Sequence, residues 1–154
     1  GLICGSGTGG NLAGVSNALK EKNKDIKIYL SDPKGSCLYS YIKTKEFKSE
    51  GNSITEGIGS SRSTKNFEKA LIDDAYSIDD TTALTVLFNL IEQEGLSLGT
   101  SSGINVAGAI KLAQELGPNK TIVTILCDKS DRYQGKLFNK KFLMDKKLPY
   151  PKWL

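Results

Sequence analysis

The sequence predicts an α/β fold, a layered parallel sheet with helices on both faces. Short apolar runs alternate with helical patterns along the whole chain, which is the element order of such a sheet. The run at 121–126 (Thr-Ile-Val-Thr-Ile-Leu) is rich in β-branched and apolar residues, as is typical of a strand buried in a parallel sheet. With 154 residues, 38% of them hydrophobic, the chain can bury one core, so we expect a single domain over 1–154.

Three strands and three helical segments are expected in the first half of the chain. Leu12, Val15 and Leu19 recur at helical spacing after a glycine-rich turn. Apolar β-forming runs between polar stretches indicate the strands. In chain order, the expected elements are a strand at Leu2–Cys4, a helix at Asn11–Lys22, a strand at Lys27–Leu30, a helix at about Leu38–Thr44, a strand at Ser53–Glu56 and a short helical stretch near Asn66–Leu71.

The second half predicts two longer helices, each bounded by recognisable cap residues. Asp79 is a good N-cap for the first of them, and Gly95 ends it. The second covers Ser102–Leu116, and Gly117-Pro118 stops it. Strands are expected at Ala75–Ile78, at the short run Leu96–Leu98 and at Thr121–Leu126.

A glycine-rich run joins the first expected strand to the first expected helix. It reads Gly5-Ser6-Gly7-Thr8-Gly9-Gly10-Asn11. Glycines allow backbone N–H groups to approach an anion, and the helix N-terminus adds partial positive charge. The pattern therefore predicts a phosphate-binding loop, with a plain tight turn as the alternative.

A dinucleotide is one phosphorylated ligand that this loop could hold. Gly5, Gly7 and Gly10 satisfy G-x-G-x-x-G. The strand at Lys27–Leu30 ends near Asp32, at roughly the 20-residue spacing expected of a ribose-binding acid. This pattern favours a nicotinamide-dependent oxidoreductase domain.

A second glycine turn changes the balance between these interpretations. The run Gly99-Thr100-Ser101-Ser102-Gly103 again leads from a short strand into a helix. Ser101 or Ser102 could be an ordinary N-cap. A dinucleotide fold, however, has no special need for this turn.

Four motifs now follow one another along the chain. Gly7-Thr8-Gly9-Gly10-Asn11 differs from G-T-G-G-T only in its last residue, and Gly57-Ile58-Gly59 reads G-I-G. Gly99–Gly103 reads G-x-S-S-G, and the run Cys127-Asp128-Lys129-Ser130-Asp131-Arg132-Tyr133 is similar to C-D-S-G-x-R-Y. In these motifs and their order, the chain resembles the cysteine synthase and cystathionine β-synthase family, which are pyridoxal-phosphate enzymes of fold type II (tryptophan synthase β-like). The resemblance covers nearly the whole chain.

The resemblance implies pyridoxal 5′-phosphate as the cofactor and assigns residues to it. Ser101 would hydrogen-bond the pyridine nitrogen. Because a serine cannot keep that nitrogen protonated as a carboxylate would, the ring becomes a milder electron sink, suited to β-elimination and replacement. We expect the fold to bring the two sites to a common cleft at the carboxyl ends of parallel strands. The phosphate would be held by the Thr8 hydroxyl and by the backbone of Gly7, Thr8, Gly9, Gly10 and Asn11.

The resemblance also implies residues that this sequence does not contain. The family's Schiff-base lysine lies in a pattern similar to P-x-x-S-x-K-D-R, and its substrate loop in one similar to T-S-G-N-x-G. Both belong to an N-terminal half, and neither pattern occurs here. We therefore interpret the chain as the C-terminal, cofactor-phosphate-binding portion of a longer enzyme, without a catalytic residue of its own and inactive alone.

The activity implied for the full-length enzyme is cysteine synthesis from O-acetylserine and sulfide by β-replacement. Cystathionine β-synthase or cysteine desulfhydrase activity is the alternative within the family, since the residues that separate these activities lie in the other half. Outside the family, a nicotinamide-dinucleotide-binding oxidoreductase domain and a truncated regulatory or partner-binding domain stay open. The resemblance further implies a homodimer and docking of serine acetyltransferase.

Composition and charge limit the remaining classes. No apolar stretch approaches the ~20 residues of a membrane span. The chain has no His, and its three cysteines form no C-x-x-C, so a metal site is not expected. Cys4 and Cys127 are expected in the core, which fits a reducing cytoplasm. The lysine-rich tail at about 134–154 is interpreted as a solvated basic surface pinned by aromatic residues, not as a nucleic-acid site.

Overall fold

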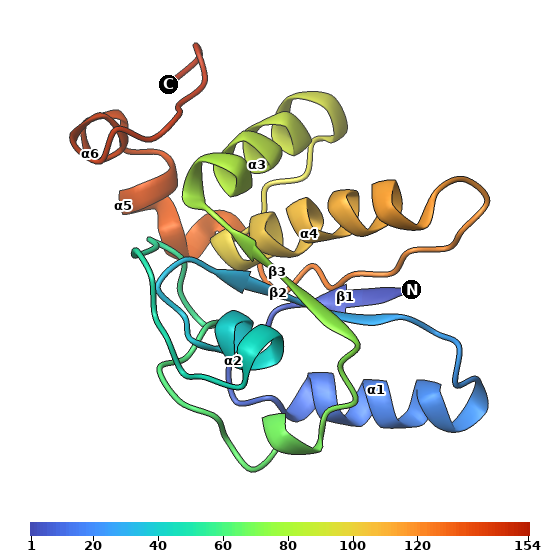
Figure 1. Ribbon diagram of the computed structural model, residues 1–154. Helices are drawn as coiled ribbons and strands as arrows, with labels where there is room; N and C mark the ends of the chain where they lie inside the picture. The colour runs from blue at the N-terminus through green and yellow to red at the C-terminus, as the bar shows by residue number, and fades with distance from the viewer.

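A three-stranded parallel sheet lies at the centre of the computed structural model, which describes residues 1–154. The strands are β1 (Leu2–Cys4), β2 (Ile28–Pro33) and β3 (Asp74–Ile78), in the order β1-β2-β3 (Figure 1). Leu2 is opposite Ile28 at one end of the register, and Leu30 is opposite Ala75 on the next pair. The carboxyl ends of all strands therefore meet at one edge.

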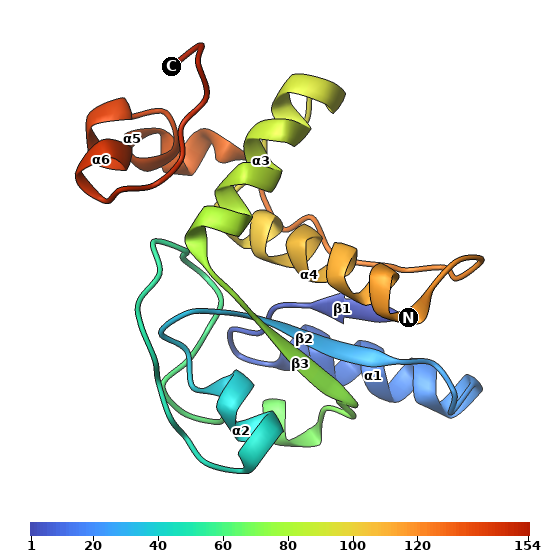
Figure 2. The same ribbon diagram turned by 45° about the horizontal axis from the view of Figure 1, so that its top comes forward.

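Helices cover both faces of this sheet, as the sequence predicts. Figures 1 and 2 show α1 (Gly10–Lys22) and α2 (Leu38–Thr44) on one side and α3 (Asp80–Glu94) and α4 (Thr100–Leu116) on the other. Alternate strand residues point to opposite faces. The α1 face buries Leu2, Ile28 and Leu30 together with Leu12, and the α4 face buries Ile3 and Tyr29 against Leu112.

Cap chemistry defines the ends of α3 as expected. The Asp79 carboxylate accepts a hydrogen bond from the Thr82 N–H (2.8 Å), and Gly95 ends the helix with a left-handed φ of 67°. Close packing of α3 against α4 depends on Gly103, since a Cβ there would lie 2.7 Å from the Ala83 carbonyl oxygen. This packing fixes the first turn of α4 relative to the sheet.

Three expected strands are not formed, because no neighbouring strand pairs with these segments along their length. Residues 53–56 lie in an irregular run between α2 and the 3-10 turn η1 (Phe67–Lys69). The Ile54 N–H bonds the Asp80 carboxylate (2.8 Å) instead of a neighbouring strand. Residues 121–126 lie beside β1, but only Val123 forms a bridge there, to Leu2. A strand needs a partner as well as a suitable composition.

The segment at 121–126 is also not buried. Val123 is 51% exposed to solvent and Leu126 is 48% exposed. The backbone groups of Ile122, Thr124 and Leu126, which point away from β1, have no hydrogen-bond partner. The expected strand Leu96–Leu98 is likewise reduced to one antiparallel bridge, between Leu98 and Lys129.

The C-terminal tail folds back on α3. It comprises η2 (Ser130–Tyr133), α5 (Gln134–Leu137), α6 (Lys140–Asp145) and a final extended stretch. The Trp153 ring meets the Phe88 ring edge-on at 6.2 Å between centroids, and its indole N–H donates to Glu92 (2.9 Å). Aromatic residues thus pin the tail to the body. None of the helices combines the length and the apolar character that a bilayer crossing requires.

Candidate cofactor site

One cleft of about 540 Å³ gathers all the cofactor-binding residues predicted from the two glycine turns. It opens where β1 ends, between the glycine loop (Gly5–Asn11) and the first turn of α4. We call it the main cleft. It is lined by Cys4, Gly5, Ser6, Gly7, Thr8, Gly9, Gly10, Asn11, Leu12, Glu56, Gly57, Ile58, Ser101, Asn105, Ile125, Cys127, Asp128, Arg132 and Tyr133.

The glycine loop presents a set of free donors to this cleft. None of the backbone N–H groups from Ser6 to Leu12 donates a hydrogen bond within the chain. The last of them belong to the first turn of α1, where the helix dipole adds partial positive charge. The loop therefore offers the donors that a bound anion requires.

Two glycines of this loop occupy positions that a side chain cannot enter. Gly9 has a left-handed φ of 83°, and a Cβ there would lie 2.6 Å from the Phe67 backbone nitrogen. A Cβ on Gly7 would lie 2.6 Å from the Gly57 carbonyl oxygen. The segment Gly57–Gly59, identified in the sequence as G-I-G, thus packs directly on the glycine loop. The Gly59 N–H also donates to the Ser6 carbonyl (2.8 Å).

The two serines of the second glycine turn have different environments. The Ser102 hydroxyl accepts a hydrogen bond from the Cys127 N–H (3.0 Å) and so supports the fold. The Ser101 hydroxyl has no partner, although the residue is 4% exposed and lines the main cleft. The N-cap of α4 is Gly99, without a side-chain cap. Neither serine is therefore the N-cap that the sequence offered as an alternative.

Asn105 is a site residue that sequence reasoning missed. It is 1% exposed in the middle of α4. Its Oδ1 accepts from the Gly5 N–H (2.6 Å) and its Nδ2 donates to the Ile125 carbonyl (2.8 Å). One side chain thus ties the glycine loop to the segment beside β1. A polar residue at a core position of an apolar helix was the available signal.

The motif at 127–133 contributes a half-buried acid, Asp128, and a buried tyrosine, Tyr133, to the cleft wall. The Tyr133 hydroxyl donates to the Asp128 carboxylate (2.7 Å), and this bond, with burial, raises the pKa of Tyr133 to about 12. Both side chains crowd Gly99, where a Cβ would lie 2.6 Å from the Tyr133 ring. The motif therefore supports the turn that carries Ser101.

The cysteine expectation is correct for one residue and wrong for the other. Cys4 is buried, and burial, together with the nearby Cys127, raises the pKa of its thiol to about 11. Cys127 is exposed and lines the main cleft. It is exposed because the segment that precedes it has no neighbour on its outer side.

Asp32, the acid of the dinucleotide interpretation, does not line the cleft. It is fully buried, and one carboxylate oxygen accepts from the Tyr39 N–H (2.8 Å) in the first turn of α2. Burial raises the pKa of Asp32 to about 6, against the hydrogen bond from the α2 backbone, which lowers it. In the structure, Asp32 accepts a hydrogen bond from the first turn of α2 and so stabilises the start of that helix.

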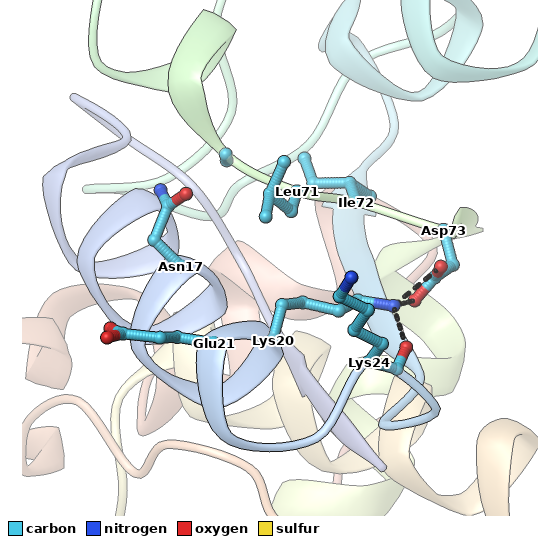
Figure 3. Close-up of a pocket in the computed structure, with 8 residues that line it drawn as sticks. Asn17, Lys20, Glu21, Lys24, Leu71, Ile72 and Asp73 are labelled. Atoms are coloured by element: carbon cyan, nitrogen blue, oxygen red, sulfur yellow. Dashed lines mark hydrogen bonds and ion pairs between the residues drawn. The ribbon is translucent and has the colours of Figure 1, made fainter.

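A second hollow, of about 740 Å³, contains no predicted site residue. It lies between α1 and the segment leading into β3 (Figure 3). Its central cation, Lys20, is engaged by the Asp73 carboxylate (2.8 Å) and the Lys24 carbonyl (3.3 Å), as Figure 3 shows. This hollow lacks the free donors of the main cleft.

The main cleft fits pyridoxal phosphate. Free N–H groups at its glycine end suit a phosphate, and the hydroxyl of Ser101, which makes no hydrogen bond within the chain, lines the same space. The glycine positions at Gly7 and Gly9 keep the cradle clear of side chains. These features are what the resemblance in the sequence leads us to expect.

Comparison with known proteins agrees with the site. A family model described as pyridoxal-phosphate dependent enzyme matches residues 1–128. The chain belongs to this family, and its cofactor is pyridoxal phosphate.

The relatives narrow the class further. The chain is 41% identical to a cysteine synthase of Dictyostelium discoideum, over 94% of this chain and 41% of the relative. It is 34% identical to cystathionine beta-synthase of Rattus norvegicus, over 94% of this chain and 26% of the relative. The O-acetylserine dependent cystathionine beta-synthase of Helicobacter pylori has a similar structure, with a TM-score of 0.78, 32% identity and coverage of 88% and 42% of the two chains. The chain thus spans less than half the length of these relatives.

Proposed function

We propose that this chain is the cofactor-binding C-terminal portion of an enzyme that makes cysteine from O-acetylserine and sulfide. The observation that carries the proposal is the set of unpartnered backbone N–H groups from Ser6 to Leu12, at the N-terminus of α1. The names of the relatives, cysteine synthases, support cysteine as the product, and the resemblance in the sequence implies O-acetylserine and sulfide as the substrates. When bound, pyridoxal phosphate provides the electron sink that allows one β-substituent of an amino acid to leave and another to replace it.

The glycine loop has the role of anchoring the phosphate. The backbone N–H groups from Gly7 to Asn11 would donate to the phosphate oxygens, and the Thr8 hydroxyl and Asn11 amide would add side-chain donors. Asn11 is exposed at the start of α1 and can donate where the family has a threonine. The dipole of α1 stabilises the negative charge.

Ser101 has the role of orienting the ring. Its hydroxyl lies in the main cleft without a partner in the chain and would hydrogen-bond the pyridine nitrogen of the bound cofactor. A hydroxyl leaves that nitrogen largely unprotonated, which suits replacement at the β-carbon. The Asp128–Tyr133 pair and Ser102 hold the surrounding turn in place.

The lysine that binds the cofactor covalently is proposed to lie in the portion of the enzyme outside this chain. The 154 residues alone are then inactive. The full-length enzyme is proposed to be a cytoplasmic homodimer that docks serine acetyltransferase, as the resemblance implies.

A second candidate is cystathionine synthesis, in which homocysteine replaces sulfide. The structural similarity to the Helicobacter pylori enzyme favours it. The test is to supply the full-length enzyme with O-acetylserine and either sulfide or homocysteine and to identify the product by mass spectrometry. Cysteine as the preferred product supports the first proposal. Cystathionine as the preferred product supports the second, and absence of both refutes the two together.

A further inference from the structure

One lysine of the basic tail is not a solvated charge. Lys136, in α5, donates to the Ile54 carbonyl (3.2 Å) and pairs with the Glu56 carboxylate. The side chain is 32% exposed. Lys141, in the neighbouring helix α6, makes no hydrogen bond or ion pair. The tail therefore reaches the body of the protein through Lys136 in a specific way.

The partner of Lys136 stands at the entrance to the main cleft. Glu56 lines that cleft and directly precedes Gly57–Gly59. The backbone N–H of Glu56 lies 3.4 Å from the Thr100 hydroxyl, at the first turn of α4. Lys136 also lowers the pKa of the Glu56 carboxyl, first through the hydrogen bond and then through its charge.

The segment held by this pair forms the wall above the glycine loop. The Gly59 N–H donates to the Ser6 carbonyl (2.8 Å), and the Gly57 carbonyl lies against Gly7. No helix or strand supports residues 45–66 before η1. Since the backbone is irregular here, its position depends on individual hydrogen bonds, from the backbone at Gly59 and Ser60 and from side chains nearer to residue 56. Asp80 anchors Ile54, and Lys136 anchors Glu56.

We propose that Lys136 is a positioning residue that couples the C-terminal tail to the cofactor site. Through Glu56 it holds Gly57–Gly59 over the glycine loop and so keeps the free N–H groups of that loop in their binding arrangement. Its effect on the cofactor rests on the proposed function, whereas its effect on the loop does not.

The test compares Lys136→Gln with the matched control Lys141→Gln in the full-length protein. Without cofactor, we expect amide hydrogen exchange at 55–59 to become about threefold or more faster in Lys136→Gln, because a local anchor is lost. The dissociation constant of pyridoxal phosphate, measured by absorbance titration, should rise about three- to tenfold. Lys136→Arg should restore both values, and Lys141→Gln should change neither.

A double-mutant cycle separates this role from a general effect on stability. Glu56→Gln should change loop exchange and the dissociation constant of pyridoxal phosphate as Lys136→Gln does. The double variant should bind the cofactor no more weakly than either single variant. Unchanged loop exchange and an unchanged dissociation constant in Lys136→Gln would overturn the proposal, as would fully additive effects. Faster loop exchange in a protein that binds no pyridoxal phosphate would support the coupling of tail and loop and would refute the proposed function instead.

Discussion

The site depends on individual residues that have been left without a partner in the chain. The Ser101 hydroxyl and the N–H groups of the glycine loop all face the main cleft without an internal hydrogen bond. Unsatisfied polar groups cost stability unless a ligand satisfies them. The neighbouring Ser102, by contrast, is fully used by the fold. The contacts of the two adjacent serines therefore differ: Ser102 supports the fold, whereas Ser101 is available to a ligand.

Replacement of Gly7 should damage cofactor binding much more than folding. In Gly7→Ala, the new Cβ meets the Gly57 carbonyl oxygen at 2.6 Å, so the glycine loop must move. We expect the dissociation constant of pyridoxal phosphate to rise at least about tenfold in an absorbance titration. The control is Gly14→Ala, where a Cβ meets nothing within 4 Å. It should bind normally and be about 0.5–1 kcal/mol more stable. Normal binding by Gly7→Ala would contradict the assigned cradle.

Ser101→Asp should alter the reaction more than retention of the cofactor. The phosphate anchor is untouched, whereas a carboxylate favours a protonated ring nitrogen and a stronger electron sink. We expect cysteine formation to slow by about tenfold or more, with the absorbance of the bound cofactor retained. Ser102→Ala should instead lower stability by about 1–3 kcal/mol, since the Cys127 N–H loses its acceptor. Unaltered turnover and spectrum in Ser101→Asp would refute the role of Ser101.

Single elements combine local sequence signals with contacts that come from elsewhere in the chain. Helix α2 is an example, because its N-terminus is satisfied by Asp32 from the end of β2. Asp32 is fully buried, so its charge is held at a cost.

Asp32 should make stability fall as the pH rises. Its folded pKa is raised to about 6 from 3.8, so the folded state holds the proton more tightly than the unfolded state. The free energy of unfolding then decreases between about pH 4 and pH 6, by at most about 3 kcal/mol for a two-unit shift, and is level above that range. Asp32→Asn should flatten this slope in urea unfolding measured from pH 4 to pH 8. An identical slope in the variant would show that Asp32 is not the group responsible.

Elements with strong internal signals could be predicted from the sequence, and elements that need a partner could not. The caps of α3 at Asp79 and Gly95 are local, and the helix is confirmed between them. The segment at 121–126 has the composition of a buried strand but lies at an open edge. The glycine loop is readable as a motif. Asn105 and Lys136 act across long stretches of sequence, so only the fold brings them to the site.

At the scale of the whole molecule, we propose that the open edge beside β1 is where a further portion of the enzyme would attach. The outward backbone groups of Ile122, Thr124 and Leu126 are unpaired, and such an edge readily accepts another strand. The relatives are more than twice as long as this chain, and this length is consistent with the proposal.

Mixing the 154 residues with a separately produced N-terminal portion should restore cysteine formation if the two portions dock. Val123→Lys should reduce the restored activity about tenfold or more, because a charge is placed beside the open edge. Ile110→Lys, at a 46% exposed position on α4, is the matched control and should restore activity normally. Turnover by the 154 residues alone, free of contaminating enzyme, would contradict the assignment of the catalytic lysine to the other portion.

The central claim is that the main cleft binds pyridoxal phosphate chiefly through its phosphate, at the glycine loop. The most direct test is to titrate the cofactor-free, full-length protein with pyridoxal phosphate and with pyridoxal, which lacks the phosphate. The account predicts that pyridoxal phosphate binds about 100-fold more tightly or better, a difference of roughly 3 kcal/mol, and that inorganic phosphate competes with it. Equal affinities for the two compounds, with no competition by phosphate, would contradict the account.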